Sequence, residues 1–120
     1  LILQGEYSFE SGVNGAKKLL SKKDKPTAIF ASNDEIAAGA LFAARLEGIE
    51  IPQQLAITGF EDSPFSRQTW PKLTTAQQPT TTIARTAANL LIQDTRNQNE
   101  ESENIIFTPE LIIRESTSPS

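Results

Sequence analysis

Three side chains suited to binding a polar small molecule each follow an apolar segment of strand length: Tyr7, Asn33 and Glu61. When consecutive strands are parallel, their carboxyl ends meet at one edge of the sheet, and open α/β sheets bind ligands there. An aromatic ring offers a flat apolar wall, an amide offers a donor and an acceptor, and a carboxylate accepts two hydrogen bonds. This combination suits a sugar or polyol, whose C–H face meets the ring while its hydroxyls meet the amide and the carboxylate.

Each of these residues also has a structural explanation. Tyr7 can be a half-buried packing aromatic, and Asn33 can be a turn residue or a helix cap. Asp34 is expected to be structural, because a carboxylate at a helix start accepts backbone N–H groups and interacts favourably with the helix dipole. Glu61 and Asp62 can be a solvated loop pair, or a like-charged pair with a raised pKa that would suit acid–base work.

Catalytic and cofactor motifs are absent from the sequence. No G-x-G-x-x-G follows a strand, and neither G-x-x-x-x-G-K-[ST] nor G-x-S-x-G occurs. The chain has no His and no Cys, which removes the commonest general base and the thiolate ligands of metals. The sequence therefore predicts a binding protein rather than an enzyme, with no cofactor and no metal site.

The elements that would position these residues alternate between strand and helix. Apolar residues at helical spacing predict helices over 9–23 and from Ser32 to about Glu47, with Ser32 as the N-cap and Glu35 closing a capping box. Gly48 suits the C′ position of the second helix. The other predictions are strands over 1–3, 27–31, 55–60, 73–77, 105–107 and 111–113, a helical turn over 65–70, a helix over about 80–95 and a surface loop over 96–104. Such alternation with short links favours an α/β fold, an open parallel sheet with flanking helices.

Composition places further bounds on the chain. Its 120 residues are the size of one domain, and its net charge of −4 lacks the basic footprint of a DNA-binding surface. It contains no Met and opens on Leu1-Ile2-Leu3, so we interpret it as a piece of a longer protein. No apolar run approaches the ~20 residues of a membrane span. Residues 116–120 are expected to fray.

In their order and spacing, several segments resemble the effector-binding domain of the LacI/GalR family of bacterial transcription regulators. The matching segments are Gly5-Glu6-Tyr7 with Ser11-Gly12, Pro26-Thr27-Ala28-Ile29-Phe30, Asn33-Asp34 with Ala37 and Gly39, Gly48-Ile49 with Ile51-Pro52, Gly59-Phe60-Glu61-Asp62, Pro71-Lys72-Leu73-Thr74-Thr75 with Gln78-Pro79, and Arg114-Glu115-Ser116-Thr117. The resemblance implies a periplasmic-binding-protein-like domain of two α/β lobes joined by crossovers, preceded by a helix-turn-helix headpiece that this chain lacks.

The resemblance also implies how the chain divides between the lobes. Residues 1–78 would belong to the C-terminal lobe, residues 79–97 would form a helix of the other lobe, residues 104–115 would return as strands, and residues 116–120 would be a tail. The implied function is that of the ligand-sensing and dimerisation domain of a cytoplasmic regulator. A small sugar-like effector would bind between the lobes and control operator binding by the headpiece.

Site residues carry over from the family one at a time. Tyr7 lies where members place an aromatic that stacks on the effector, and Asn33 lies where some sugar-responsive members hydrogen-bond a hydroxyl. Glu61 stands where most members have Asp, so its carboxylate is extended by roughly 1.5 Å, one C–C bond. Gln78 lies at the crossover, where a side chain touches ligand or hinge. Three neighbours are assigned structural roles beside the site: Asp34, Phe60 and Asp62.

The family pairs two subunits partly through the Ala-rich helix over 36–47. Small residues permit close approach, and a two-fold interface is self-complementary. The alternative is that these Ala side chains simply pack against the sheet. The residues expected in a homodimer interface are Ala38, Leu41, Phe42, Arg45, Phe65 and Thr69, the last two on the turn over 65–70.

Two other functions compete with the regulator. A periplasmic sugar-binding protein of a transport system shares the fold and would carry a signal peptide instead of a headpiece. An enzyme on an α/β sheet would have to use Glu61 and Asp62, without His, Cys or a phosphate loop. The expected partners of the regulator are a saccharide, a second copy of the chain, and operator DNA through the headpiece, with no membrane.

Overall fold

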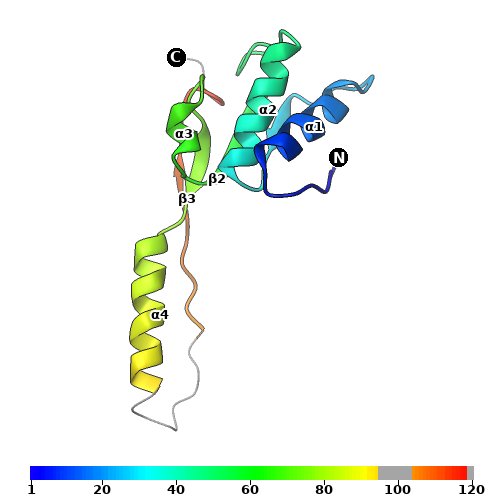
Figure 1. Ribbon diagram of the computed structural model, residues 1–120. Coiled ribbons are helices and arrows are strands. Elements are labelled where there is room, and N and C mark those ends of the chain that lie inside the picture. Colours follow the sequence, from blue (N-terminus) through cyan, green and yellow to red (C-terminus); the bar gives the residue numbers. More distant parts are fainter. Residues whose placement is uncertain (95–103, 119–120) are drawn as a thin grey trace.

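The computed structural model describes residues 1–94 and 104–118 (Figure 1). In chain order the elements are α1 (Phe9–Leu20), β1 (Ala28–Phe30), α2 (Asp34–Leu46), β2 (Ala56–Glu61), α3 (Phe65–Gln68), β3 (Thr74–Gln77), α4 (Thr80–Asp94) and β4 (Glu110–Ile112). The predicted alternation of strand and helix is confirmed. Part of the loop predicted over 96–104 and residue 95 of the predicted helix lie outside the described residues, as do residues 119 and 120.

The strands form one open four-stranded sheet in the order β1-β2-β3-β4. β1 and β3 both run parallel to β2, with Phe30 opposite Thr58 and Glu61 opposite Gln77. β4 is antiparallel to β3, with Gln77 opposite Glu110. The parallel arrangement is therefore correct for the first three strands. β4 reverses direction because the chain leaves the end of β3, forms α4 and returns (Figure 1).

The core lies between α1, α2 and the sheet. α2 packs on β2, and α1 packs on α2 (Figure 1). Two glycines allow the helices to approach closely, because a Cβ at Gly12 would meet the backbone carbonyl of Ile36 and a Cβ at Gly39 would meet that of Phe9. Many of the Ala side chains of α2 are buried in this core, as the packing alternative predicts. The buried apolar cluster comprises Ala16, Leu20, Ala31, Ala37, Ala40, Leu41, Ala43, Ala44, Leu55, Ile57 and Leu73.

Replacing Gly39 with Ala is expected to lower the free energy of unfolding by about 1–3 kcal/mol, because the added methyl overlaps backbone that cannot move alone. Gly15 is the matched control: it lies in α1, and a Cβ there would meet nothing within 4 Å. Gly15→Ala should raise stability by about 0.5–1 kcal/mol through helix propensity. Urea unfolding of both variants checks the pair. Equal effects would contradict the close helix approach.

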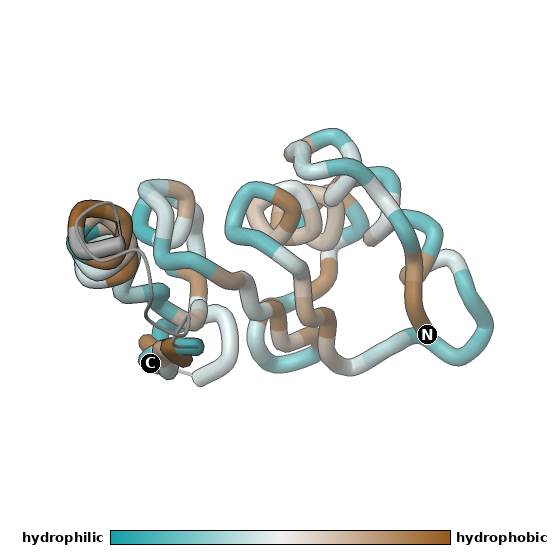
Figure 2. Tube along the Cα trace, turned by 90° about the horizontal axis from the view of Figure 1, so that it is seen from below, coloured by the Kyte–Doolittle hydropathy of each residue, from teal (hydrophilic) through white to brown (hydrophobic). Residues whose placement is uncertain are grey.

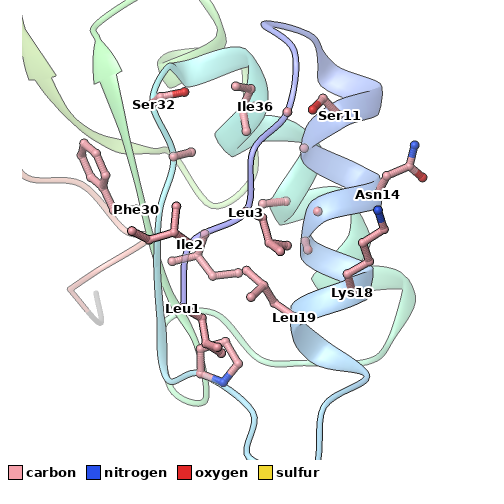
Figure 3. Close-up of a pocket in the computed structure, with 18 of the residues that line it drawn as sticks. Leu1, Ile2, Leu3, Ser11, Asn14, Lys18, Leu19, Phe30, Ser32 and Ile36 are labelled. Atoms are coloured by element: carbon pink, nitrogen blue, oxygen red, sulfur yellow. The ribbon is translucent and has the colours of Figure 1, made fainter.

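Two predicted strands do not form. Leu1–Leu3 makes no strand, and its first two side chains are 81% and 97% exposed. The segment runs between β1 and α1 (Figure 3) and joins no ladder with the edge strand β1. Residues 105–107 also lack strand structure, and the final strand is β4 alone. Apolar composition predicted these strands, but a strand also needs a neighbour with which to exchange backbone hydrogen bonds.

The prediction that the C-terminal residues fray is wrong for Ser116 and Thr117. Ser116 is fully buried, and its hydroxyl donates to the Ile57 carbonyl at 2.6 Å and accepts from the Thr74 N–H at 2.8 Å. The hydroxyls of Thr117 and Thr74 lie 2.7 Å apart. These bonds anchor the chain after β4 to β2 and β3, because buried backbone groups beyond the ladders require partners.

α4 extends away from the sheet and from α1 and α2 (Figure 1). Apolar side chains remain exposed on it, including Leu90, Leu91 and Ile92, and Figure 2 shows apolar residues along this helix. The chain reaches α4 directly from β3 and returns to the sheet at β4. α4 is thus joined to the body of the chain through the β3–β4 pair.

Candidate functional site

The predicted ligand residues gather at the carboxyl ends of the parallel strands. Asn33 follows β1, Glu61 ends β2, and Gln78 directly follows β3. Tyr7 precedes α1 and is 74% exposed. The start of α1 lies beside the start of α2, because the Phe9 N–H donates to Glu35 Oε1 at 3.2 Å. The order of the strands therefore places Asn33, Glu61 and Gln78 at one edge of the sheet. Tyr7 was predicted to follow a strand over 1–3, which does not form, so only the contact between the starts of α1 and α2 relates it to this edge.

Asn33, not Ser32, is the N-cap of α2. Its Oδ1 accepts a hydrogen bond from the Ile36 N–H at 2.8 Å, and the residue is only 7% exposed. Ser32 is exposed, and Glu35 bonds to α1 instead of closing a capping box. The predicted capping box of Ser32 and Glu35 is therefore wrong. The N-cap is one residue later, at Asn33, whose side-chain oxygen accepts the hydrogen bond from the first turn of the helix.

The cap fixes the orientation of the Asn33 amide. A backbone N–H only donates, so the side-chain atom facing Ile36 must be the oxygen. The Nδ2 group is the donor of this side chain, and the cap bond holds χ2 and therefore the direction of that donor.

Asp34 ties three segments together beneath this edge. The residue is fully buried; its Oδ2 accepts from the Ser63 N–H at 2.7 Å and its Oδ1 accepts from Thr75 Oγ1 at 2.6 Å. Gly59 lies against this carboxylate, since a Cβ there would meet Asp34 Oδ1. Asp34 thus connects the start of α2 to β3 and to the loop after β2, and it is unavailable to a ligand.

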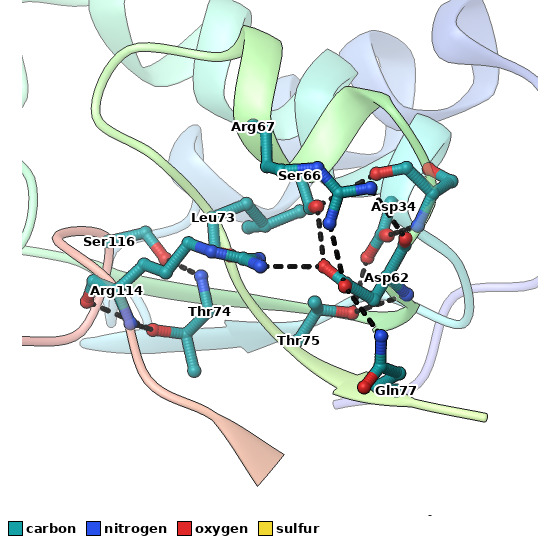
Figure 4. A network of polar contacts seen from close by, with 11 residues as sticks. Asp34, Asp62, Ser66, Arg67, Leu73, Thr74, Thr75, Gln77, Arg114 and Ser116 are labelled. Carbon is teal, nitrogen blue, oxygen red and sulfur yellow. Dashed lines mark hydrogen bonds and ion pairs between the residues drawn. The ribbon is translucent and has the colours of Figure 1, made fainter. Parts of the chain in front are cut away.

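Asp62 is the centre of a network of charged hydrogen bonds (Figure 4). Its Oδ1 accepts from Ser66 Oγ at 2.8 Å and from Arg114 Nη2 at 2.7 Å. Its Oδ2 accepts from Arg67 Nη1 at 2.7 Å and from Gln77 Nε2 at 3.1 Å. The Asp62 side chain is 3% exposed, against 14% for Arg114 and 54% for Arg67. Arg114 is therefore the shielded partner and Arg67 the solvated one.

The carboxyls of Glu61 and Asp62 shift in opposite directions. Burial alone would raise the pKa of Asp62, but hydrogen bonds from Ser66, Arg114 and Arg67 outweigh it and hold the pKa below its ordinary value of 3.8. Partial burial raises the pKa of Glu61 above 4.5, and the nearby charges of Asp34 and Glu35 raise it further. The Asp62 carboxylate is thus stabilised in its ionised form by its pairing with Arg114 and Arg67.

Glu61 is the carboxylate that stays exposed at this edge. Its backbone φ is 102° and that of Asp62 is 55°, so two consecutive residues occupy a region that favours glycine. Such conformations persist only where the surroundings determine them, and they cluster at binding and active sites. An exposed carboxylate on a constrained backbone can accept two hydrogen bonds from a ligand's hydroxyls.

Replacing Glu61 with Gln is expected to raise Tm slightly at pH 7. Because the folded-state pKa of Glu61 is raised above its unfolded value, ionisation of this carboxyl disfavours the folded state at high pH. The gain in Tm should be present above the raised pKa and vanish as pH falls below 4.5, where both states are protonated. Calorimetric melting from pH 4 to pH 8 checks this, with exposed Glu110→Gln as the control. A lower Tm at pH 7 would contradict it.

Several residues of the network were not singled out from the sequence. They are Ser66 and Gln77, together with Thr74, Thr75 and the segment Arg114–Thr117, which are noted only as part of the family resemblance. Ser is common in turns and Thr is common in strands, so the presence of Ser in α3 and Thr in β3 does not indicate that these side chains join a hydrogen-bond network. Arg114 also donates from Nη1 to the Leu73 carbonyl at 2.8 Å, and it lies 52 residues from Asp62 in the chain.

A cavity of about 590 Å³ lies elsewhere, between the N-terminal segment, α1 and β1 (Figure 3). Its lining is mainly apolar and includes Leu1, Ile2, Leu19 and Ile29. None of the four predicted ligand residues lines it. The cavity reflects the unpaired Leu1–Leu3 segment rather than the candidate site.

The residues predicted for a dimer interface divide into two groups. Ala38 and Leu41 are buried within this chain, whereas Phe42, Arg45 and Phe65 are exposed. Thr69 is half-buried, as is Phe60 beside the site. The ring of Phe42 lies 5.7 Å from that of Phe9.

Neither a metal-binding group of side chains nor a helix that could span a membrane is found in the part of the chain that the structure describes. Residues 1–94 and 104–118 contain no group of three acidic, His or Cys side chains that could hold a metal ion. Within the same ranges, no helix has the length and apolar character needed to cross a membrane.

Comparisons with known proteins match nearly the whole chain. The family model described as "Periplasmic binding protein-like domain" matches residues 3–117. The ribose operon repressor of Haemophilus influenzae is 36% identical over 115 residues, which cover 96% of this chain and 35% of the repressor. The chain therefore spans about a third of the length of that relative.

Solved structures agree in fold. A LacI-family regulatory protein from Chloroflexus aggregans has a TM-score of 0.88 and 38% identity over 98% of this chain and 42% of its own. A LacI-family regulator from Enterococcus faecium with bound ribose has a TM-score of 0.87 and 29% identity over 100% of this chain and 44% of its own. The chain belongs to the periplasmic binding protein-like domain family, in the form found in LacI-type transcription regulators.

Proposed function

We propose that the chain is part of the effector-sensing domain of a LacI-type transcription regulator, and that it binds a small sugar-like molecule. The observation that carries this proposal is the placement of two polar groups at one edge of the sheet: the amide of Asn33, whose orientation the cap fixes, and the exposed carboxylate of Glu61, whose backbone has a positive φ. Tyr7 supplies the apolar wall and Gln78 a polar contact at the crossover. The bound ribose in the Enterococcus faecium relative supports a saccharide as the ligand class.

The division into lobes is part of the proposal. Residues 1–78 form the C-terminal lobe, residues 79–97 belong to a helix of the other lobe, and residues 104–115 return to the sheet. The extension of α4 away from the sheet, joined through β3 and β4, supports this division (Figure 1). Effector bound between the lobes would alter their closure and so the geometry of two DNA-binding headpieces.

Pairing with a second copy of the chain is also proposed. The exposed apolar side chains on α2 and α3 support it, with Phe42 and Phe65 as the anchors and Arg45 at the rim. Because Ala38 and Leu41 are buried within the chain, they would shape the helix packing beneath the interface rather than add area to it. Operator DNA would be a partner only through a headpiece outside this chain, and the protein would act in the cytoplasm.

The competing functions have less support. The curated relative and the solved structures described above are regulators rather than transport proteins or enzymes. Asp62 forms ion pairs with two arginines, so an acid–base pair of Glu61 and Asp62 lacks one of its members. The proposal is accordingly a non-enzymatic sensor without a cofactor.

A thermal-shift screen of the full-length protein tests the proposed ligand class. D-ribose comes first, followed by other monosaccharides, disaccharides, nucleosides and purines. A ligand that binds only the native state adds about 2.7 kcal/mol of stability at 100 times its Kd, which is several degrees in Tm. A shift with one sugar supports the proposal. A shift only with a purine or nucleoside would overturn the saccharide assignment, and no shift at all would count against a sensor.

A further inference from the structure

The turn that presents Glu61 is held from both sides. Glu61 and Asp62 have positive φ, which residues with a Cβ adopt rarely unless neighbouring contacts enforce it. The Asp62 N–H donates to Thr75 Oγ1 at 3.4 Å, and the next N–H, that of Ser63, donates to Asp34 Oδ2 at 2.7 Å. The backbone after Glu61 is therefore bonded to α2 and to β3.

The carboxylate of Asp62 provides the remaining restraint, and its partners come from distant parts of the chain. Gln77 is the last residue of β3, directly before the crossover to α4, and it lies opposite Glu61 in the sheet. Arg114 lies just after β4, on the segment that returns from α4. Its other terminal nitrogen donates to Leu73, next to the start of β3 (Figure 4). Asp62 thus contacts β3, which leads to α4, and the segment directly after β4, on the return path from α4.

We propose that Asp62 is the positioning residue of the site: held by Arg114 and Gln77, it sets the direction of the Glu61 carboxylate and ties that carboxylate to β3 and to the segment after β4. This inference rests on the proposed function, in which Glu61 holds the ligand and α4 belongs to the opposite lobe. A ligand that engages Glu61 acts on the turn, and the turn acts on β3 and on the segment after β4. By reciprocity, a change in the β3–β4 pair alters the affinity at Glu61.

A purely structural ion pair between Asp62 and Arg114 is the alternative, and the two explanations predict opposite signs. The pKa of Glu61 is raised by its burial and by the charges of Asp34 and Glu35. If Arg114 acts only through its charge, removing that cation leaves the negative charges uncompensated and raises the pKa of Glu61 further. If Arg114 acts by holding Asp62, its removal relaxes the turn and lets Glu61 move further into solvent and away from Asp34 and Glu35, so the pKa of Glu61 falls.

The experiment is a carboxyl ¹³C NMR titration of Glu61 in the full-length protein, with the resonance assigned by its loss in Glu61→Gln. Arg114→Gln removes the shielded cation while keeping a polar side chain. Gln77→Ala removes a neutral partner of Asp62 and changes no charge, and it decides the question if Arg114→Gln does not fold. Lys72→Gln is the charge control, because Lys72 is an exposed cation at the start of the same strand segment.

The proposal predicts that the pKa of Glu61 falls toward 4.5 in both Arg114→Gln and Gln77→Ala and does not fall in Lys72→Gln. A rise or an unchanged pKa in a folded Arg114→Gln, or an unchanged pKa in Gln77→Ala, would overturn it. Binding of D-ribose to the same variants is measured separately by calorimetry. If the titrations behave as predicted while D-ribose and the other screened sugars fail to bind even the wild type, the positioning role stands and the proposed function fails.

Discussion

Replacing Asp62 with Asn is expected to lower the free energy of unfolding by about 3 kcal/mol. This is the lower end of the range found when one partner of a buried ion pair is removed. The Asp62 side chain is 3% exposed and accepts four side-chain hydrogen bonds, two of them from arginines. An Asn side chain has one acceptor oxygen, so its NH₂ group would face a donor, and Arg114 would lose its anion.

Urea unfolding at pH 7 measures this effect, with Asp24→Asn on an exposed loop as the matched control. Arg67→Ala should cost only about 0–1 kcal/mol, because its side chain is 54% exposed and the pair is solvated. Because the folded-state pKa of Asp62 lies below 3.8, its contribution is present above 3.8 and is lost as pH falls through the folded value. The deficit of Asp62→Asn should therefore shrink at low pH. A loss no larger than that of the control would refute the network's role in stability.

Replacing Asn33 with Ser is expected to reduce affinity for the sugar by about 10–100-fold with little loss of stability. A Ser hydroxyl still accepts the Ile36 N–H as an N-cap, but it lacks the Nδ2 donor proposed to meet the ligand. Leaving a ligand hydroxyl without its partner costs about 1–3 kcal/mol, and a loss of about 10–100-fold, which is about 1.4–2.8 kcal/mol, lies within that range. Asn33→Ala should lose the same affinity and, in addition, about 1 kcal/mol of stability because the cap is gone.

Calorimetry with the sugar found in the screen gives the affinities, and urea unfolding gives the stabilities. The comparison of Ser with Ala separates the two roles of Asn33, because only the Ala variant removes the cap. If Asn33→Ser binds the sugar as tightly as the wild type, Asn33 is a cap and nothing more. If both variants lose stability equally, the bond from Ile36 is not the source of the cap's effect.

Local sequence signals predicted the elements that depend on local chemistry. The apolar runs at β1, β2 and β3, the helical periodicity of α1, α2 and α4, and the glycine after α2 are properties of short windows. Gly48 indeed has φ +69° just beyond the C-cap. The gathering of Asn33, Glu61 and Gln78 at one edge followed from the parallel order of the strands.

Predictions failed where the outcome depended on partners far along the chain. Leu1–Leu3 is apolar enough for a strand but joins no ladder. Ser116 was expected to fray because it lies near a terminus, but it bonds to Ile57 and Thr74. The pairing of Asp62 with Arg114 spans 52 residues, and no spacing rule links them. Ser32 and Asn33 are adjacent and both are preferred N-cap residues, so the sequence alone does not decide which of them begins the helix.

Control of DNA binding by a sugar is the central claim, and its most direct measurement is operator affinity with and without that sugar. Operator DNA is selected from random duplexes by the full-length protein, and binding is followed by fluorescence anisotropy at fixed salt. We predict that the sugar changes operator affinity by about 5–150-fold, the span of ordinary allosteric coupling, and that operator changes sugar affinity by the same factor. Operator affinity that is unchanged by a sugar bound at saturation would contradict the account.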